Sequence, residues 1–260
     1  MDPDTTLYRQ EAMFSEKALC RTTTLELYEL LGRQGSHPPA GLVFATGEAL
    51  ARELGYREDD LAFLPSHMLD SFVGAAALAC EVPPLSGETG PTWVVDVGCG
   101  AGVDSLLLAR RGYRVVALDG ASSMLRRLSD GARAVPSGRR SLHPVRALLP
   151  ELPLTAGKAS WALLNGVANL LPERNLLLAE LARVLRPGGQ LLIADLFALG
   201  ELPPEVRESP EAWAWCLAGA ASPDEWRRSL CDAGFENEEL QIFEEILPLG
   251  RGLLRARKRG

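Results

Sequence analysis

The residues best suited to chemistry are two acids and three alternating glycines. Gly98, Gly100 and Gly102 follow a short apolar run that contains Asp96, and Asp119 closes the next apolar run. This pattern predicts a strand, a glycine turn, a helix and a second parallel strand, the first half of a doubly wound sheet. Ligands of such sheets bind beyond the carboxyl ends of the strands, where Asp119 can accept hydrogen bonds from both hydroxyls of a ribose.

The spacing of the glycines distinguishes between two kinds of nucleotide. Dinucleotide sites use G-x-G-x-x-G, in which the third glycine allows close helix packing and the helix N-terminus holds a pyrophosphate. Here the pattern is G-x-G-x-G, and Val103 stands where the dinucleotide pattern has its third glycine. A turn without side chains lets a bulky ligand approach the backbone. The sequence therefore predicts a nucleoside site without a pyrophosphate cradle.

Two motifs together carry a resemblance to a known family. The stretch 96–102 with Asp119, and Leu185-Arg-Pro-Gly-Gly before a fifth apolar strand, resemble class I S-adenosylmethionine-dependent methyltransferases. The resemblance implies a Rossmann-like fold and S-adenosylmethionine as cofactor. The alternative is another Rossmann-type nucleotide-binding protein, which a glycine turn alone would not exclude.

The resemblance also implies which residues contact the cofactor. In this family an acid after the third strand often holds the adenine amino group, but 145–149 has no acid, so backbone groups must bind the base. Methyl transfer is an in-line displacement that needs alignment more than acid–base chemistry, and we assign no catalytic residue. The expected cofactor-binding residues are Asp96, Gly98, Cys99, Gly100, Asp119, Gly120, Met124, Leu148 and Asn165.

A closer resemblance extends over most of the chain, from Ala49 to Leu247. The stretches 54–61, 98–105, 165–172 and 215–220 are similar to the arsenite methyltransferases. In that branch, thiolates from three segments hold trivalent arsenic, a soft centre that thiolates suit.

Only one of the three arsenic-binding cysteines has a counterpart here. Cys216 matches the third, the second is replaced by Gly166, and 71–77 has no cysteine where the first would lie. Cys20 and Cys80 are close in sequence but wrongly spaced. The resemblance thus implies the fold and the methyl donor and argues against arsenite as the substrate. The residues expected at the substrate are Cys216, Trp215, Asn169 and, as a candidate base, His67.

The most consistent interpretation is a cytoplasmic S-adenosylmethionine-dependent methyltransferase that acts on a small molecule. Two alternatives remain. One is methylation of a metalloid or a thiol with the help of Cys216. The other belongs to a different class, a cofactor-binding protein that no longer methylates and uses the pocket structurally or for a non-methyl reaction. The absent cysteines and the absent adenine acid motivate this last hypothesis.

The predicted architecture is an α/β fold with a seven-stranded, mostly parallel, doubly wound sheet. Residues 1–90 are expected to form a helical cap, and 91–260 the cofactor-binding domain, with a Trp-rich lid at about 199–222. Predicted helices cover 7–31 (two helices), 46–54, 72–80, 104–110, 121–128, 175–185 and 223–233. Predicted strands cover 93–97, 113–118, 145–149, 161–164, 191–194, 239–243 and 252–257, and 131–144 is expected to be loop.

Composition limits the other possibilities. With 260 residues, 47% of them hydrophobic and 23% charged, the chain has ample material for a core. A formal net charge of −7 provides no overall basic field for nucleic acid. The N-terminus lacks the apolar run of a signal peptide, and no segment is expected to cross a membrane. Five scattered cysteines without a C-x-x-C pair indicate a reduced, cytoplasmic protein with no disulfide framework and no metal site.

Overall fold

A seven-stranded sheet forms the centre of the protein in the computed structural model, which describes residues 3–35, 45–87, 90–135 and 141–260. The strand order is β3-β2-β1-β4-β5-β7-β6. The first five strands are parallel, and β7 is antiparallel to both neighbours. The predicted fold class is confirmed. The strands are β1 (Trp93–Val97), β2 (Arg114–Asp119), β3 (Leu142–Arg146), β4 (Ala159–Asn165), β5 (Leu185–Ala198), β6 (Phe235–Ile246) and β7 (Leu249–Lys258).

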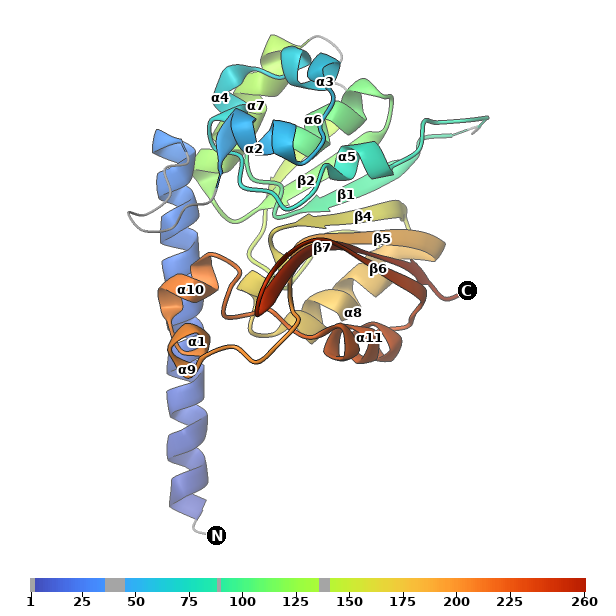
Figure 1. The fold of residues 1–260 in the computed structure, drawn as a ribbon. Coiled ribbons are helices and arrows are strands. Elements are labelled where there is room, and N and C mark those ends of the chain that lie inside the picture. Colours follow the sequence, from blue (N-terminus) through green and yellow to red (C-terminus); the bar gives the residue numbers. More distant parts are fainter. Residues whose placement is uncertain (1–2, 36–44, 88–89, 136–140) are drawn as a thin grey trace.

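Helices cover both faces of the sheet (Figure 1). On one face lie α2 (Gly47–Glu53), α3 (Glu58–Phe63), α4 (Ser66–Leu69), α5 (Leu78–Glu81), α6 (Val103–Arg110) and α7 (Ser122–Ala134). On the other lie α8 (Arg174–Val184) and α11 (Pro223–Asp232). Alternate strand residues point to the two layers: Val94 belongs to the apolar cluster of the first and Val95 to that of the second. Helices α2–α5 share one cluster with α6 and α7, so this part of the N-terminal segment is continuous with the core.

One long helix, α1 (Pro3–Gln34), passes along the carboxyl ends of the strands (Figure 1). The prediction of two helices in this region was wrong. No glycine or proline lies between residues 4 and 31, and the three threonines at 22–24 are weak helix formers that do not terminate a helix. The short helices η2 (Ala168–Leu170) and α10 (Pro210–Ala214) contact α1, and α9 (Pro204–Arg207) contacts α10.

The end of α1 is joined to the start of α7 by hydrogen bonds. Ala121, the N-cap of α7, provides no side-chain cap. The carboxylate of Glu29 takes that role, accepting hydrogen bonds from the backbone N–H of Ser122 (2.6 Å) and Ser123 (3.2 Å). Gly32 permits this approach, because a Cβ there would lie 2.2 Å from Ser123 Oγ and 2.8 Å from Met124 N. Helix α1 is therefore held directly against the segment that follows β2.

The segment predicted as a helix at 72–80 is helical only in α5. The reason is that side chains from elsewhere bind the backbone amides a helix would use. Asn165 Oδ1 accepts from Ala75 N (2.6 Å) and Ala76 N (3.3 Å), and Asp104 Oδ1 accepts from Ala79 N (2.7 Å). Tertiary hydrogen bonds have thus outweighed the high helix propensity of alanine.

Two further corrections concern the region from 131 to 149. Helix α7 continues through Gly131 to Ala134, where a loop was predicted. The third strand is β3 at 142–146 and not 145–149. Pro144 made this segment look like loop, but β3 is the edge strand, where proline is tolerated because one side of the strand has no partner.

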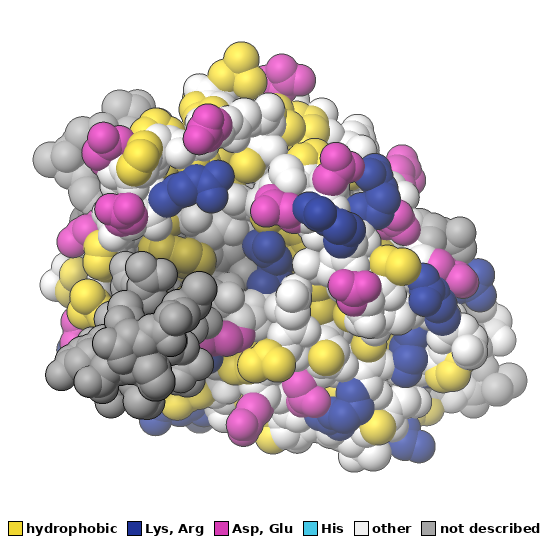
Figure 2. All heavy atoms as spheres, turned by 90° about the horizontal axis from the view of Figure 1, so that it is seen from below, with side chains coloured by type: hydrophobic (Ala, Val, Ile, Leu, Met, Phe, Trp, Pro, Cys, Tyr) yellow, Lys and Arg dark blue, Asp and Glu magenta, His cyan; other side chains and the backbone are white. Residues whose placement is uncertain are grey.

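The C-terminal part follows the prediction closely. Ser222 caps α11, and Glu225, three residues later, completes a capping box. The two predicted C-terminal strands are present as β6 and β7, which pair antiparallel and are longer than predicted at both ends. Figure 2 shows one face of the molecule, seen from below, on which acidic and basic side chains are interspersed. Among the described residues, no helix is long and apolar enough to cross a membrane.

The close approach at Gly32 yields a stability prediction. Alanine normally stabilises a helix by about 1 kcal/mol relative to glycine. Gly32→Ala should instead destabilise the protein by roughly 1–3 kcal/mol, because its Cβ meets the backbone of α7. Urea unfolding measures the difference. The control is Gly90→Ala, whose Cβ has no atom within 4 Å and should leave the midpoint nearly unchanged. A Gly32→Ala protein as stable as the wild type would contradict this account of α1 docking.

Candidate functional site

The glycine turn between β1 and α6 is shaped by its neighbours. Gly98 and Gly102 have φ values of +67° and +79°, which disfavour side chains. A Cβ would also lie 2.4 Å from Val167 Cγ2 at Gly98 and 2.3 Å from Leu128 Cδ1 at Gly102. At Gly100 a Cβ would have no atom within 4 Å. The turn is thus tightly packed on two sides and open at its middle.

Asp119, at the end of β2, is held beside this turn. Its Oδ2 accepts from Gly100 N (2.8 Å) and its Oδ1 from Ala121 N (2.8 Å). Burial raises the pKa of the Asp119 carboxyl, although these two hydrogen bonds act in the opposite direction. The carboxylate therefore has a fixed orientation at the rim of the turn.

Asp96 lies beneath the turn and is only 3% exposed. Ser105 Oγ, from the first turns of α6, donates to its Oδ2 at 2.6 Å. Burial, followed by the charge of Asp104, raises the pKa of Asp96 to about 7. Asp96 is therefore an acid that a nearby cation would help to ionise.

Asp104 joins three parts of the site. It accepts hydrogen bonds from Tyr56 Oη (2.7 Å), Ala79 N (2.7 Å) and Asn165 Nδ2 (2.9 Å). Burial raises the pKa of Asp104, and these hydrogen bonds to its charged form oppose that effect. Asn165 also donates to Ala76 O at 2.8 Å. Because the Asn165 amide is fully engaged, its side chain fixes the 71–79 segment against the turn.

These elements surround a pocket of about 360 Å3 at the carboxyl ends of β1, β2 and β4. All nine residues that the sequence assigns to the cofactor line it. Met124 lies on its floor and is 1% exposed, and Leu148 lies at its edge and is 63% exposed. The structure thus brings the predicted cofactor residues together, and their binding role remains a prediction.

The four residues predicted at the substrate are not in the lining of this pocket. Cys216 lies behind Gly166, which lines the pocket. The Sγ of Cys216 donates to the carbonyl oxygen of Gly166 at 3.2 Å. Burial and then the charge of Asp195 raise the thiol pKa of Cys216, so the thiol is neutral. Cys216 also has a φ of +63°, a conformation that costs a non-glycine residue about 1 kcal/mol or more. Trp215 is partly buried against the core.

Asn169 and His67 have structural partners. Asn169 is fully buried, and its Nδ2 donates to Asp195 Oδ1 at 2.9 Å and to Leu196 O at 2.6 Å. His67 lies in α4, with its Nε2 3.2 Å from the carbonyl oxygen of Arg127 in α7. Each of these contacts joins two elements of the fold outside the pocket lining.

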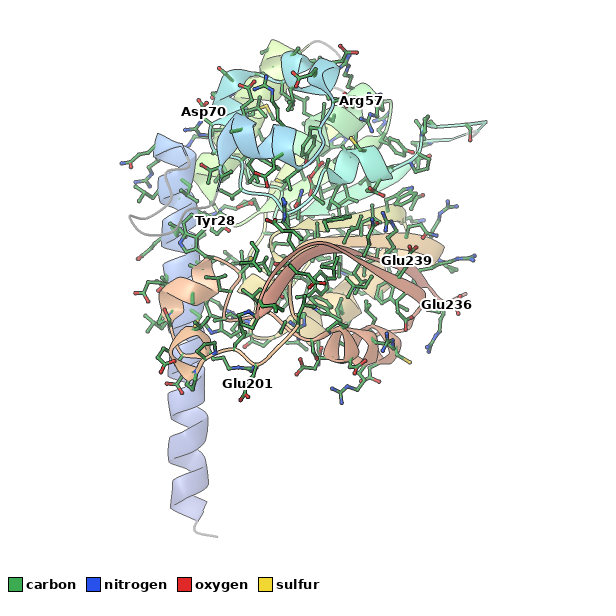
Figure 3. All side chains as sticks on the ribbon, viewed as in Figure 1. Tyr28, Arg57, Asp70, Glu201, Glu236 and Glu239 are labelled. Carbon is green, nitrogen blue, oxygen red and sulfur yellow. The ribbon has the colours of Figure 1, made fainter. Side chains whose placement is uncertain are left out.

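The contribution of α1 to the pocket was not among the residues predicted for the site. Arg21, Thr24, Leu25 and Tyr28 all line it, at spacings of three and four residues that place them on one helix face. The spacing was visible in the sequence. Which face meets the pocket depends on the docking of α1 at α7, which no local pattern reveals. Figure 3 labels Tyr28 on α1, beside the strand ends.

Metal ligation has no support within the described part of the chain. There, no group of three or more His, Cys, Asp or Glu side chains could hold a metal ion. Cys80, Cys99, Cys216 and Cys231 form no disulfide.

Comparisons with known proteins agree with this geometry. Residues 90–234 match the sequence profile of a family described as "Methyltransferase domain". An arsenite methyltransferase from Halobacterium salinarum is 29% identical over 201 residues, which are 75% of this chain and 49% of that protein. A trans-aconitate 2-methyltransferase from Azoarcus sp. is 38% identical over 130 residues, 49% of this chain and 48% of that protein. The chain thus spans about half the length of these two relatives.

Solved structures show the same fold. The arsenic(III) S-adenosylmethionine methyltransferase from Chlamydomonas reinhardtii superposes with a TM-score of 0.60 and 23% identity. The alignment covers 78% of this chain and 72% of that one. At 23% identity, this likeness supports the fold alone.

The raised pKa of Asp96 predicts a pH dependence of stability. The carboxyl has a pKa near 3.8 when unfolded and about 7 when folded, so its ionisation opposes folding as the pH rises from about 4 to 7. Asp96→Asn removes this effect. Between pH 5 and pH 8, the unfolding free energy of the variant relative to that of the wild type should therefore rise by on the order of 2 kcal/mol. Urea unfolding across this range measures it, and a difference independent of pH would contradict the assignment.

Proposed function

We propose that this chain, which belongs to the methyltransferase-domain family, binds S-adenosylmethionine in the pocket and transfers its methyl group to a small organic molecule. The observation that carries the proposal is the position of Asp119. Its carboxylate is fixed by Gly100 N and Ala121 N at the rim of an open glycine turn. This is the position from which an acid can bind both hydroxyls of a ribose.

The residues around the pocket fit such a cofactor. Asp96 lies beneath the glycine turn, where its carboxylate favours the cationic sulfonium and ammonium groups. Leu148 and Met124 offer apolar contacts for the adenine. When bound, the cofactor would supply an activated methyl group on sulfur. The chain's own residues would align it, and α1 would shield it from water.

A cytoplasmic location is part of this proposal. Cys80 and Cys231 are exposed and form no disulfide. Thiols of this kind persist in a reducing compartment. The division into a cap at 1–90 and a methyltransferase domain at 91–260 with a lid at 199–222 also remains a proposal.

A second candidate function is methylation of a metalloid or a thiol. The similarity to arsenite methyltransferases favours it, and Cys216 would be the residue involved. In the structure this thiol is neutral and hydrogen-bonded to the pocket wall, which disfavours a thiolate ligand. The third possibility, a protein that binds the cofactor without methylating, predicts binding but no methylated product.

Replacing Asp119 tests the proposed cofactor site. Asp119→Ala should weaken S-adenosylmethionine binding by tenfold or more, because two charge-assisted hydrogen bonds to the ribose are lost. Titration calorimetry with S-adenosylmethionine and S-adenosylhomocysteine measures this. Asp130→Ala, which removes an exposed acid paired with Arg133, is the matched control and should bind normally. Failure of the wild type to bind either nucleoside would refute the proposed function.

Replacing Cys216 separates the first two candidates. If the acceptor is an organic molecule, Cys216→Ser should keep methyl transfer within about threefold of the wild type, since the thiol does not line the pocket. If the acceptor is a metalloid or thiol held by Cys216, activity should be abolished. Product formation by the two proteins, with arsenite and with organic acceptors, distinguishes these outcomes.

A further inference from the structure

The pocket face of α1 carries a buried hydroxyl group without a partner. Thr24 Oγ1 is buried and has no hydrogen-bond partner in the structure. Its neighbour Thr22 shows the usual arrangement, since its Oγ1 donates to the carbonyl oxygen of Ala18, one turn back, at 3.0 Å. Buried polar groups in folded proteins are normally satisfied, so an unpaired hydroxyl in a pocket wall points to a ligand.

Two other polar side chains share this face with Thr24. Tyr28 lies one turn along and also lines the pocket. Burial raises the pKa of Tyr28 well above its usual value, so its hydroxyl stays protonated and can donate. Arg21 lines the mouth, where it pairs with Glu173 at 2.8 Å. The face therefore offers hydrogen-bond donors to whatever lies opposite the glycine turn.

A general base for the acceptor is missing from the described lining. It contains no histidine or lysine. Asp119 accepts hydrogen bonds from backbone N–H groups, and Asp104 accepts from the backbone and from neighbouring side chains. Asp96 accepts one from Ser105, and all three acids lie at the cofactor end. Burial raises the thiol pKa of Cys99, so the thiol stays protonated and cannot take up a proton from an acceptor. An acceptor in this pocket must therefore be nucleophilic without losing a proton to the protein.

We propose that the Arg21–Thr24–Tyr28 face binds an organic carboxylate, which the enzyme converts to its methyl ester; this inference rests on the proposed function. A carboxylate is ionised at neutral pH, accepts hydrogen bonds from hydroxyl groups and is attracted to a sulfonium. One carboxylate oxygen would attack the methyl carbon as the carbon–sulfur bond breaks. The electron pair of that bond passes to sulfur, giving S-adenosylhomocysteine and a neutral ester, and no proton moves.

The apolar part of the lining defines the rest of the acceptor. Leu149, Val167, Leu170 and Leu171 line the pocket together with the α1 face. A carboxylate on a hydrocarbon body would place its charged end at the hydroxyls and its body against these side chains. Arg21 at the mouth would suit a second acidic group.

The test uses the full-length protein with methyl-tritiated S-adenosylmethionine and a set of acids: trans-aconitate, malonate, benzoate and octanoate, each beside its amide. Methyl esters release volatile methanol in base, whereas thioethers, methylamines and methylated arsenic do not. The expected result is that base releases tritiated methanol from the product of at least one acid and none from the reaction with its amide. Arsenite and a thiol are run in parallel.

The outcomes keep this inference separate from the proposed function. Failure to bind S-adenosylmethionine in calorimetry would refute both. Two results would overturn the carboxylate assignment while the cofactor site stands: a methylated product that releases no methanol in base, or no ester from any of the acids. In both cases S-adenosylmethionine would still bind normally.

Two variants test the α1 face itself. Thr24→Val and Tyr28→Phe each remove one hydroxyl at nearly constant volume, and each should lower kcat/KM for the acid about tenfold, mainly through KM. Their affinity for S-adenosylhomocysteine should stay within twofold of the wild type. Thr23→Val, on the same helix but not in the lining, is the control and should behave as wild type. Unchanged KM in both hydroxyl variants would overturn the assignment of this face.

Discussion

The site depends above all on the hydrogen bonds of one buried carboxylate, Asp104. It is 5% exposed and accepts from Tyr56, Ala79 and Asn165, which come from three separate parts of the chain. Taking a carboxylate out of water is costly, and the three donors offset that cost only while all of them are in place. The first turn of α6, the end of β4 and the 71–79 segment therefore hold one another in position, and together they form the wall opposite α1.

Helix α1 forms the wall that the doubly wound sheet lacks. Glu29 caps α7 from outside, and Gly32 lets the two helices approach closely, so α1 is attached where the ribose site begins. These contacts set which face of α1 lines the pocket. The cofactor end of the pocket is thus built from acids and glycines of the sheet, and the opposite end from hydroxyl groups and aliphatic side chains.

Much of this arrangement could be predicted from the sequence because its signals are local. The glycine spacing and the acid at a strand end each act within a few residues, as does the Ser222–Glu225 capping box. The cofactor residues that the family resemblance implies line one pocket. The failures involve distant contacts. No continuous helix forms at 72–80, because the side chains of Asn165 and Asp104 bind its backbone amides. The Arg21–Thr24–Tyr28 face meets the pocket only because of the way α1 docks on α7. Asn169 and His67 have the residue types of functional groups, but their partners are structural.

A crystal structure with S-adenosylhomocysteine tests the central claim most directly. The account predicts that the nucleoside occupies the pocket with its ribose hydroxyls on Asp119, its amino acid part above Asp96 and its sulfur facing Thr24 and Tyr28 across open space. Electron density for the nucleoside at another place, or a ribose that does not contact Asp119, would contradict it.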